Sequence, residues 1–195
     1  PLQYAQRLFY LNAGCVHEAP AGQVDRAYVE RLHNLMAGLA PGAKLLLFAF
    51  ERFHDRDGRP VPARTSFHVP DAYAARIARE FPQGFEWAAS IHPYRDDCVA
   101  ALDAAVASGA RAVKWLPAAM GIDPADPRCD AFYAALARHD LPLITHAGEE
   151  KAVHGAGDDL DAGQQPGERH PSPFGTDVAG DHFGGPPVEG VLGCR

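Results

Sequence analysis

Short apolar runs recur along the chain, and each one ends at or near an ionisable residue. Residues 44–50, 86–91, 111–116 and 141–146 are apolar runs of strand length. The ionisable residues at or near their ends are, in chain order, Glu51, His92, Lys114 and His146. Continuous apolar runs are typical of strands that are covered on both faces in a parallel sheet. The pattern therefore predicts buried strands that deliver reactive side chains to one rim.

Segments between these runs have the three- and four-residue apolar spacing of amphipathic helices. The predicted helices cover residues 24–40, 71–80, 98–108 and 131–139. Gly109 follows the third of them, in the usual place for a glycine that ends a helix. Because helices and strands alternate, the connections are crossovers and the sheet is parallel. The predicted fold class is α/β.

Two α/β architectures fit this order, a (β/α) barrel and an open doubly wound sheet. An open nucleotide-binding sheet normally carries a glycine-rich loop after a strand. No G-x-G-x-x-G or G-x-x-x-x-G-K motif follows any of these runs, which favours the barrel. A complete eight-fold barrel usually needs about 250 residues. This chain has 195, so we expect a partial (β/α)8 TIM barrel.

The composition changes from Gly155 onward. Ten of the 19 glycines and five of the 17 prolines fall in residues 155–195, where no apolar run of four residues occurs. Such a segment cannot bury enough apolar surface to offset the entropy lost on ordering. We therefore predict a barrel-like domain over residues 1–154 and a disordered Gly/Pro-rich tail over residues 155–195.

Charge and hydropathy argue against two classes of partner. The formal net charge is −7 and no cluster of Lys and Arg occurs, so nucleic acid binding is not expected. The longest apolar run, residues 45–50, is far shorter than a membrane-spanning helix, which needs about 20 residues. The four cysteines form no C-x-x-C pair, which favours a reducing cytoplasm. The chain starts at Pro1 without Met, so we expect a fragment of a longer protein.

His146 is the strongest candidate for chemistry. It ends an apolar run and is followed by an Ala147-Gly148 turn and the paired carboxylates Glu149 and Glu150. Neutral imidazole is the commonest protein ligand for zinc-like metals and a frequent general base. The alternative is a histidine whose ring nitrogens are hydrogen-bonded at a strand end. We predict a catalytic or metal-binding role.

His92 and Lys114 have both a functional and a structural interpretation. His92 precedes Pro93, which favours an extended backbone at a strand end, where the ring could contact substrate. It could equally be hydrogen-bonded beneath the loop. Lys114 lies within an apolar strand, where an unpaired ammonium is expensive to bury. It could contact a substrate carboxylate, lie near a metal, or form a salt bridge.

Other polar residues are weaker candidates. Glu149 and Glu150 could orient water or substrate, or could hold a metal-binding histidine by a hydrogen bond, and solvated loop carboxylates are the alternative. Glu51 and Arg95 follow strands in the same way. His54 and His68 lie in predicted loops, and we expect both to be surface residues.

Several motifs together resemble a known family. They are HPY at residues 92–94, GA-x-x-VKWLP at 109–117, DP-x-DPRC-x-x-FY at 123–133 and LPL-x-TH-x-GEE at 141–150. In these the chain resembles metal-dependent hydrolases of the amidohydrolase superfamily, in its amidohydrolase-related branch, from about Val24 to Asp158. The resemblance implies a distorted (β/α)8 barrel that binds one or two divalent metals, usually zinc, which activate water. Some relatives in this branch instead perform non-oxidative decarboxylation.

The resemblance also implies residue roles. His146 matches the histidine that closes the family's fifth strand, a metal ligand, and Lys114 matches the fourth strand, whose lysine in part of the superfamily is carboxylated and bridges two metals. The family's first strand supplies an H-x-H pair, and this chain has no two histidines one residue apart. The sixth-strand histidine and eighth-strand aspartate have no counterpart either. We therefore expect barrel strands two to five only, and we hypothesise that the tail after Asp158 is translated out of frame.

The sequence thus predicts a metal-dependent hydrolase that acts on a small molecule, with weak metal binding and slow or absent hydrolysis. Glu149, Glu150 and His92 are the predicted catalytic residues, and His146 and Lys114 the predicted metal residues. One alternative is a non-catalytic α/β module, and another is an open α/β enzyme that uses His146 as a base without metal. Unpaired strand edges along residues 44–50 and 141–146 predict self-association.

Overall fold

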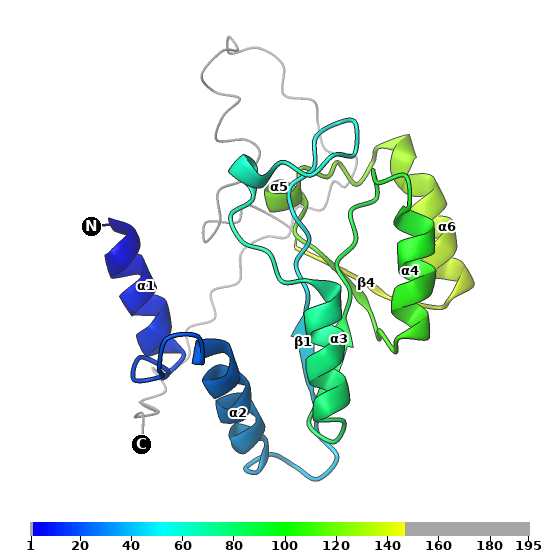
Figure 1. Cartoon of the computed structure of the whole chain (residues 1–195). Helices are drawn as coiled ribbons and strands as arrows, with labels where there is room; N and C mark the ends of the chain where they lie inside the picture. The colour runs from blue at the N-terminus through cyan, green and yellow to red at the C-terminus, as the bar shows by residue number, and fades with distance from the viewer. Residues whose placement is uncertain (1, 147–195) are drawn as a thin grey trace, which may run out of the picture.

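The computed structural model of the chain describes residues 2–146 (Figure 1). The helices are α1 (Leu2–Ala13), α2 (Val24–Met36), α3 (Asp71–Glu80), α4 (Cys98–Ala107), α5 (Pro117–Met120) and α6 (Asp130–Arg138). The strands are β1 (Leu45–Phe48), β2 (Phe85–Ala88), β3 (Val113–Trp115) and β4 (Leu143–Thr145), and two short 3-10 turns are η1 (Pro62–Arg64) and η2 (Pro127–Cys129). The predicted tail, residues 155–195, lies outside the described residues.

The described strands run parallel, in the order of the chain. β1 pairs with β2, and β3 pairs with β4. A parallel bridge between Ala89 and Val113 joins the two pairs, and the Lys114 amide donates to the carbonyl of Ala89 at 2.7 Å. The mixed α/β class and the short parallel strands are confirmed. A sheet that adds each new strand beside the previous one is the arrangement of a (β/α) barrel.

Helices cover the strands where the sequence predicts helices. α3 packs on β1 and β2, and α4 packs against α6 (Figure 1). Trp115 of β3 has no exposed surface and stacks on Phe132 of α6, with ring centroids 5.3 Å apart. Its indole N–H donates to the carbonyl of Ile91 at 2.8 Å, so the polar end of this large side chain is also satisfied. The core therefore lies between the strands and these helices.

The predicted helix at residues 71–80 coincides with α3, whereas the predicted strands are longer than the observed ones. β2 was predicted over residues 86–91, but its pairing with β1 ends at Ala88, after which Ala89 donates to Ala112 beside β3. Apolar residues continue past the strand because they remain buried in the loop. Two helices differ from the prediction: α1 forms where no helix is predicted, and α5 forms where a loop is predicted. α5 ends at Gly121, whose φ of 76° is left-handed.

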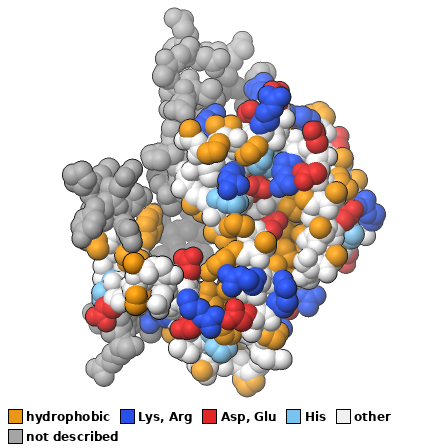
Figure 2. Space-filling model, in the orientation of Figure 1, with side chains coloured by type: hydrophobic (Ala, Val, Ile, Leu, Met, Phe, Trp, Pro, Cys, Tyr) orange, Lys and Arg blue, Asp and Glu red, His pale blue; other side chains and the backbone are white. Residues whose placement is uncertain are grey.

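The lengths of the helices decide whether any of them could span a membrane. Within the described part of the chain, no helix is long and apolar enough to cross a bilayer. On the face shown in Figure 2, positive and negative side chains lie interspersed rather than gathered into a basic patch.

Candidate functional site

The described strands all end at one rim of the sheet. Their register is parallel throughout, with Leu45 opposite Phe85 and Val113 opposite Leu143. The carboxyl ends of parallel strands meet on one side, where (β/α) barrels build their active sites. The loops that follow β1 and β2, together with the segment that follows β4, therefore form the candidate site.

Lys114 and His146 lie on the same face of two neighbouring strands. Lys114 is in register with Ile144, and His146 follows Ile144 by two residues, which returns its side chain to the face of Ile144. The His146 amide donates to the carbonyl of Trp115 at 3.2 Å, so backbone pairing continues to this residue. The convergence of His92, Lys114 and His146 on one pocket stays a prediction. The metal-binding roles of Lys114 and His146 remain predictions.

The side chain of Lys114 is buried with only 9% of the residue exposed. Its ammonium nitrogen lies 5.8 Å from the centroid of the Phe48 ring, which comes from β1. An aromatic face attracts a cation electrostatically and partly offsets its loss of hydration. Lys114 therefore reaches from β3 across β2 toward β1, on the face that His146 shares.

His92 has both ring nitrogens occupied by backbone groups. Its Nε2 lies 2.9 Å from the carbonyl oxygen of Met120, and its Nδ1 lies 3.2 Å from the amide nitrogen of Tyr94. Since a carbonyl accepts and an amide donates, Nε2 carries the proton and Nδ1 is the acceptor. The ring has no exposed surface, and burial first, then the neighbouring His54, lower its pKa to about 3. These contacts favour the structural alternative for His92, and its catalytic role stays a prediction.

His54 is the candidate that sequence analysis missed. It was interpreted as a surface residue, but only 4% of it is exposed, so that interpretation was wrong. Its ring lies against that of His92, with centroids 4.4 Å apart, and its Nδ1 lies 3.0 Å from the carbonyl oxygen of Arg52. The apolar Phe53, also buried, directly precedes it. An aromatic neighbour inside a turn-rich loop was the available signal that the loop folds inward.

Glu51 and Arg95, the weaker candidates, are brought together in one ion network. Arg95 donates to Glu51 Oε2 at 2.7 Å and makes two bonds of 2.8 Å to the carboxylate of Asp97. Hydrogen bonds from Arg95 lower the pKa of Asp97. His68 Nε2 lies 3.8 Å from Glu51 Oε1, and burial lowers the pKa of His68. This network ties the end of β1 to the start of α4.

Asp71 adds a half-buried carboxylate whose pKa responds to the charges of Glu51 and Arg95. One of its oxygens accepts the amide proton of Ser90 at 2.8 Å, just beyond the end of β2. Burial is the main cause that raises its pKa to about 6, and the charge of Glu51 adds to the shift. The Ser90 hydroxyl in turn accepts the amide proton of Glu51 at 3.0 Å. Asp71 therefore helps to join α3, β2 and the loop after β1.

A polar cleft of about 450 Å³ opens beside this network. Its walls are the loop after β1 and the loop between β2 and α4, and its lining includes Arg52, His54, Gly58, Arg95 and Asp97. Gly58 has a φ of 74°, and a Cβ there would lie 2.1 Å from the carbonyl oxygen of Tyr94. Only glycine lets the two loops approach so closely. We call this space the polar cleft.

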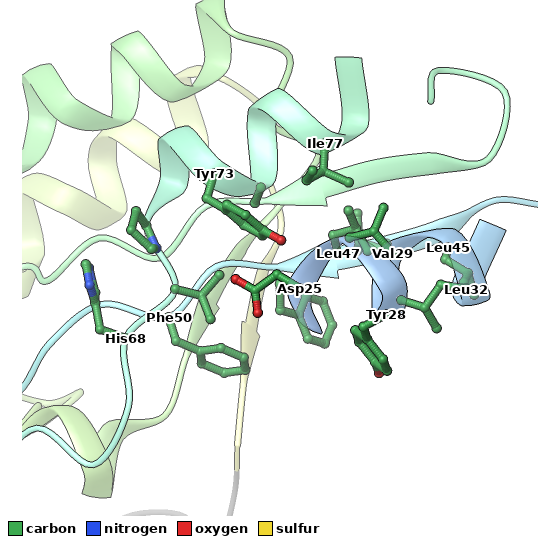
Figure 3. A pocket seen from close by; sticks show the side chains of 15 residues that line it. Asp25, Tyr28, Val29, Leu32, Leu45, Leu47, Phe50, His68, Tyr73 and Ile77 are labelled. Carbon is green, nitrogen blue, oxygen red and sulfur yellow. The ribbon is translucent and has the colours of Figure 1, made fainter. Parts of the chain in front are cut away.

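A second space is an apolar groove of about 640 Å³ between α2, β1 and α3 (Figure 3). Val29 and Leu32 from α2, Leu47 from β1 and Ile77 from α3 line it, and Asp25 points into it. The groove contains none of the predicted site residues. It follows the edge of β1 that has no paired strand among residues 2–146.

The described residues do not form a complete metal site. No group of three or more His, Cys, Asp or Glu side chains within residues 2–146 is arranged to hold a metal ion. Glu149 and Glu150, predicted to be catalytic, lie outside the described residues. His146 and Lys114 are therefore two neighbouring candidate positions rather than a ligand shell.

Comparison with known families gives one match. A family model described as amidohydrolase matches residues 22–193. No curated protein matches the chain. The match continues well past Asp158, where the resemblance was expected to end. An out-of-frame tail would not be expected to match the family, so this comparison does not support that hypothesis.

Proposed function

Because this chain belongs to the amidohydrolase family, we propose that its fold serves hydrolysis of a small molecule by metal-activated water. The family implies a TIM barrel and typically uses divalent metals. The observation that carries the proposal is the shared face of Lys114 and His146 at adjacent strand ends. Such barrels bind their ligands at the rim formed by the carboxyl ends of the parallel strands, through side chains that converge there.

The proposed metal is zinc, and His146 would be its ligand in the described part of the chain. Lys114 would lie beside it, and Glu149 and Glu150 would orient water or substrate. A catalytic zinc site usually has three protein ligands and one open position. The described residues alone do not meet that requirement. We therefore propose weak metal affinity and slow hydrolysis.

Metal content is the direct test. After incubation with zinc and dialysis, we expect clearly less than one zinc per chain by elemental analysis, and we expect His146→Ala to retain less than the wild type. His17→Ala is the control, because His17 is exposed in a loop outside the candidate site. One tightly held zinc per chain together with turnover would contradict the proposed weakness. Equal zinc in both variants and the wild type would contradict the role of His146.

A second candidate function is a non-catalytic binding module that keeps the family fold. The absence of an H-x-H pair in the sequence favours it, as does the lack of a three-ligand cluster among residues 2–146. A panel of a lactone, an amide and an aromatic carboxylic acid would separate the two functions. Hydrolysis, or release of carbon dioxide from the acid, supports an enzyme. No turnover by folded protein with added zinc supports the module.

We also propose self-association through strand edges. Among the described residues, β1 pairs only with β2 and β4 only with β3, so each has one open edge. Phe48 at the end of β1 is 37% exposed. Open, apolar edges promote pairing between chains. Light scattering after size-exclusion chromatography should show a mass that rises with concentration, and a monomer at every concentration would contradict this.

A further inference from the structure

His54 presents an unprotonated nitrogen in a defined direction. Its Nδ1 lies 3.0 Å from the carbonyl oxygen of Arg52, and a carbonyl can only accept, so Nδ1 carries the proton of the neutral ring. The Nε2 atom of that tautomer has a lone pair and no proton. The contact with His92 and the backbone bond from the His54 amide to Met120 hold the ring in place.

His54 lines the polar cleft, and Nε2 is the ring nitrogen that the Arg52 carbonyl does not occupy. Within residues 2–146, no hydrogen bond or ion pair involves this atom. It is not a sealed buried atom either, because no fully buried side-chain nitrogen or oxygen in the described part lacks a partner. His54 lines the polar cleft although 4% of the residue is exposed. A nearly buried acceptor without a protein partner is therefore available to a ligand in the cleft.

Arg52 supplies the uncommitted positive charge of the same cleft. In the described part of the chain, its guanidinium makes no hydrogen bond or ion pair, and the residue is exposed. Arg95 differs, because Glu51 and Asp97 already occupy its donors. Asp96 also lines the cleft and is exposed, as Arg52 is, so water screens both charges. Beside the Asp96 carboxylate, the groups left for a ligand are the His54 acceptor and the Arg52 guanidinium, whose planar fork suits a carboxylate.

We propose that the polar cleft binds a small hydroxycarboxylic acid. Its hydroxyl donates to His54 Nε2, and its carboxylate accepts from Arg52. A cleft of about 450 Å³ lies in the size range of small-molecule sites. The inference goes beyond the proposed hydrolysis and does not depend on it, because binding is measured directly and without metal.

Three small probes test the two contacts separately. Glycolate carries both groups, acetate lacks the hydroxyl, and ethanolamine replaces the carboxylate by an ammonium. In NMR titrations of the whole chain labelled with ¹⁵N, glycolate should shift the His54 Nε2 resonance with a Kd of about 1–100 mM. Acetate should bind several-fold more weakly. Equal affinity for glycolate and acetate, a preference for ethanolamine, or no shift with glycolate would overturn the proposal.

Matched variants assign the effect to the two residues. His54→Asn keeps a donor near the Nδ1 position and removes Nε2, so glycolate affinity should fall about tenfold. His54→Gln restores an acceptor near Nε2 and should lose less. Arg52→Gln should also cost about tenfold, and Arg52→Lys less, since lysine keeps the charge without the fork. Thermal unfolding confirms that each variant is folded, and unchanged glycolate affinity in folded His54→Asn contradicts the assignment.

Discussion

The loop after β2 and the loop after β1 each carry a buried histidine, and the two rings lie against each other but differ in their hydrogen-bond partners. In the loop after β2, His92 has both nitrogens bonded to backbone and no exposed surface. In the loop after β1, His54 has one nitrogen bonded and the other open to the polar cleft. A position in a loop that follows a strand therefore does not decide whether a histidine is structural or available to a ligand. The partners of its two nitrogens decide it.

Substitutions of His92 and His54 should differ most in their effect on the free energy of unfolding. His92→Phe leaves the Tyr94 amide without its acceptor in a buried place and removes one donor from the Met120 carbonyl. Leaving buried polar groups unsatisfied costs about 1–3 kcal/mol each, so we expect a loss of about 3 kcal/mol in the free energy of unfolding. His54→Phe removes one bond and should cost about 1 kcal/mol. Urea unfolding measures the free energy lost in each variant. Equal losses would contradict the claim that His92 is bonded at both nitrogens and His54 at only one.

Gly58 forms part of the wall of the polar cleft. Gly58→Ala places a Cβ 2.1 Å from the Tyr94 carbonyl oxygen, in addition to the strain of a φ of 74°. Gly42→Ala is the matched control, because Gly42 has a φ of 83° and nothing within 4 Å of the new Cβ. We expect a loss of about 3 kcal/mol for Gly58→Ala and about 1 kcal/mol for Gly42→Ala in chemical denaturation. Similar losses would mean that the two loops do not approach closely.

The contributions of His92 and Asp71 to stability should depend on pH in opposite directions. The pKa of His92 is lowered from 6.5 to about 3, so the unfolded chain binds more protons in that window. The contribution of His92 to stability is complete above pH 6.5 and is lost as the pH falls toward 3. His92→Gln should therefore flatten the decline in the free energy of unfolding between these values. An unchanged slope in this variant would contradict a buried, neutral His92.

Asp71 makes the free energy of unfolding depend on pH in the opposite direction and by a smaller amount. Its pKa is raised from 3.8 to about 6, so the folded chain binds more protons in that window. Its contribution is complete below pH 3.8 and is lost as the pH rises through 6. Asn can still accept from Ser90, so Asp71→Asn should stabilise the protein by about 1 kcal/mol above pH 6, and this gain should vanish below about pH 4. Urea unfolding at several pH values tests this, and a gain that does not depend on pH would contradict the shift.

Much of the fold could be predicted from the sequence, because apolar runs and helical spacing report burial directly. The positions of β1–β4 and α3 follow from that local signal. The network of Glu51, Arg95 and Asp97 could not be predicted, because it joins residues 44 positions apart through a loop. The same holds for His54, since its ring packs on His92 and its amide bonds to Met120, both far along the chain. Hydrogen-bond partners across loops leave no periodic pattern.

His92 and His54, whose rings lie against each other, carry a proton on opposite ring nitrogens, and one ring is sealed while the other is open to a ligand. Long-range ¹H–¹⁵N correlation spectra of the imidazole rings at neutral pH test it most directly. We predict that His92 carries its proton on Nε2 and that His54 carries its proton on Nδ1 with a bare Nε2. The same tautomer at both residues, or a proton on Nε2 of His54, would contradict the account.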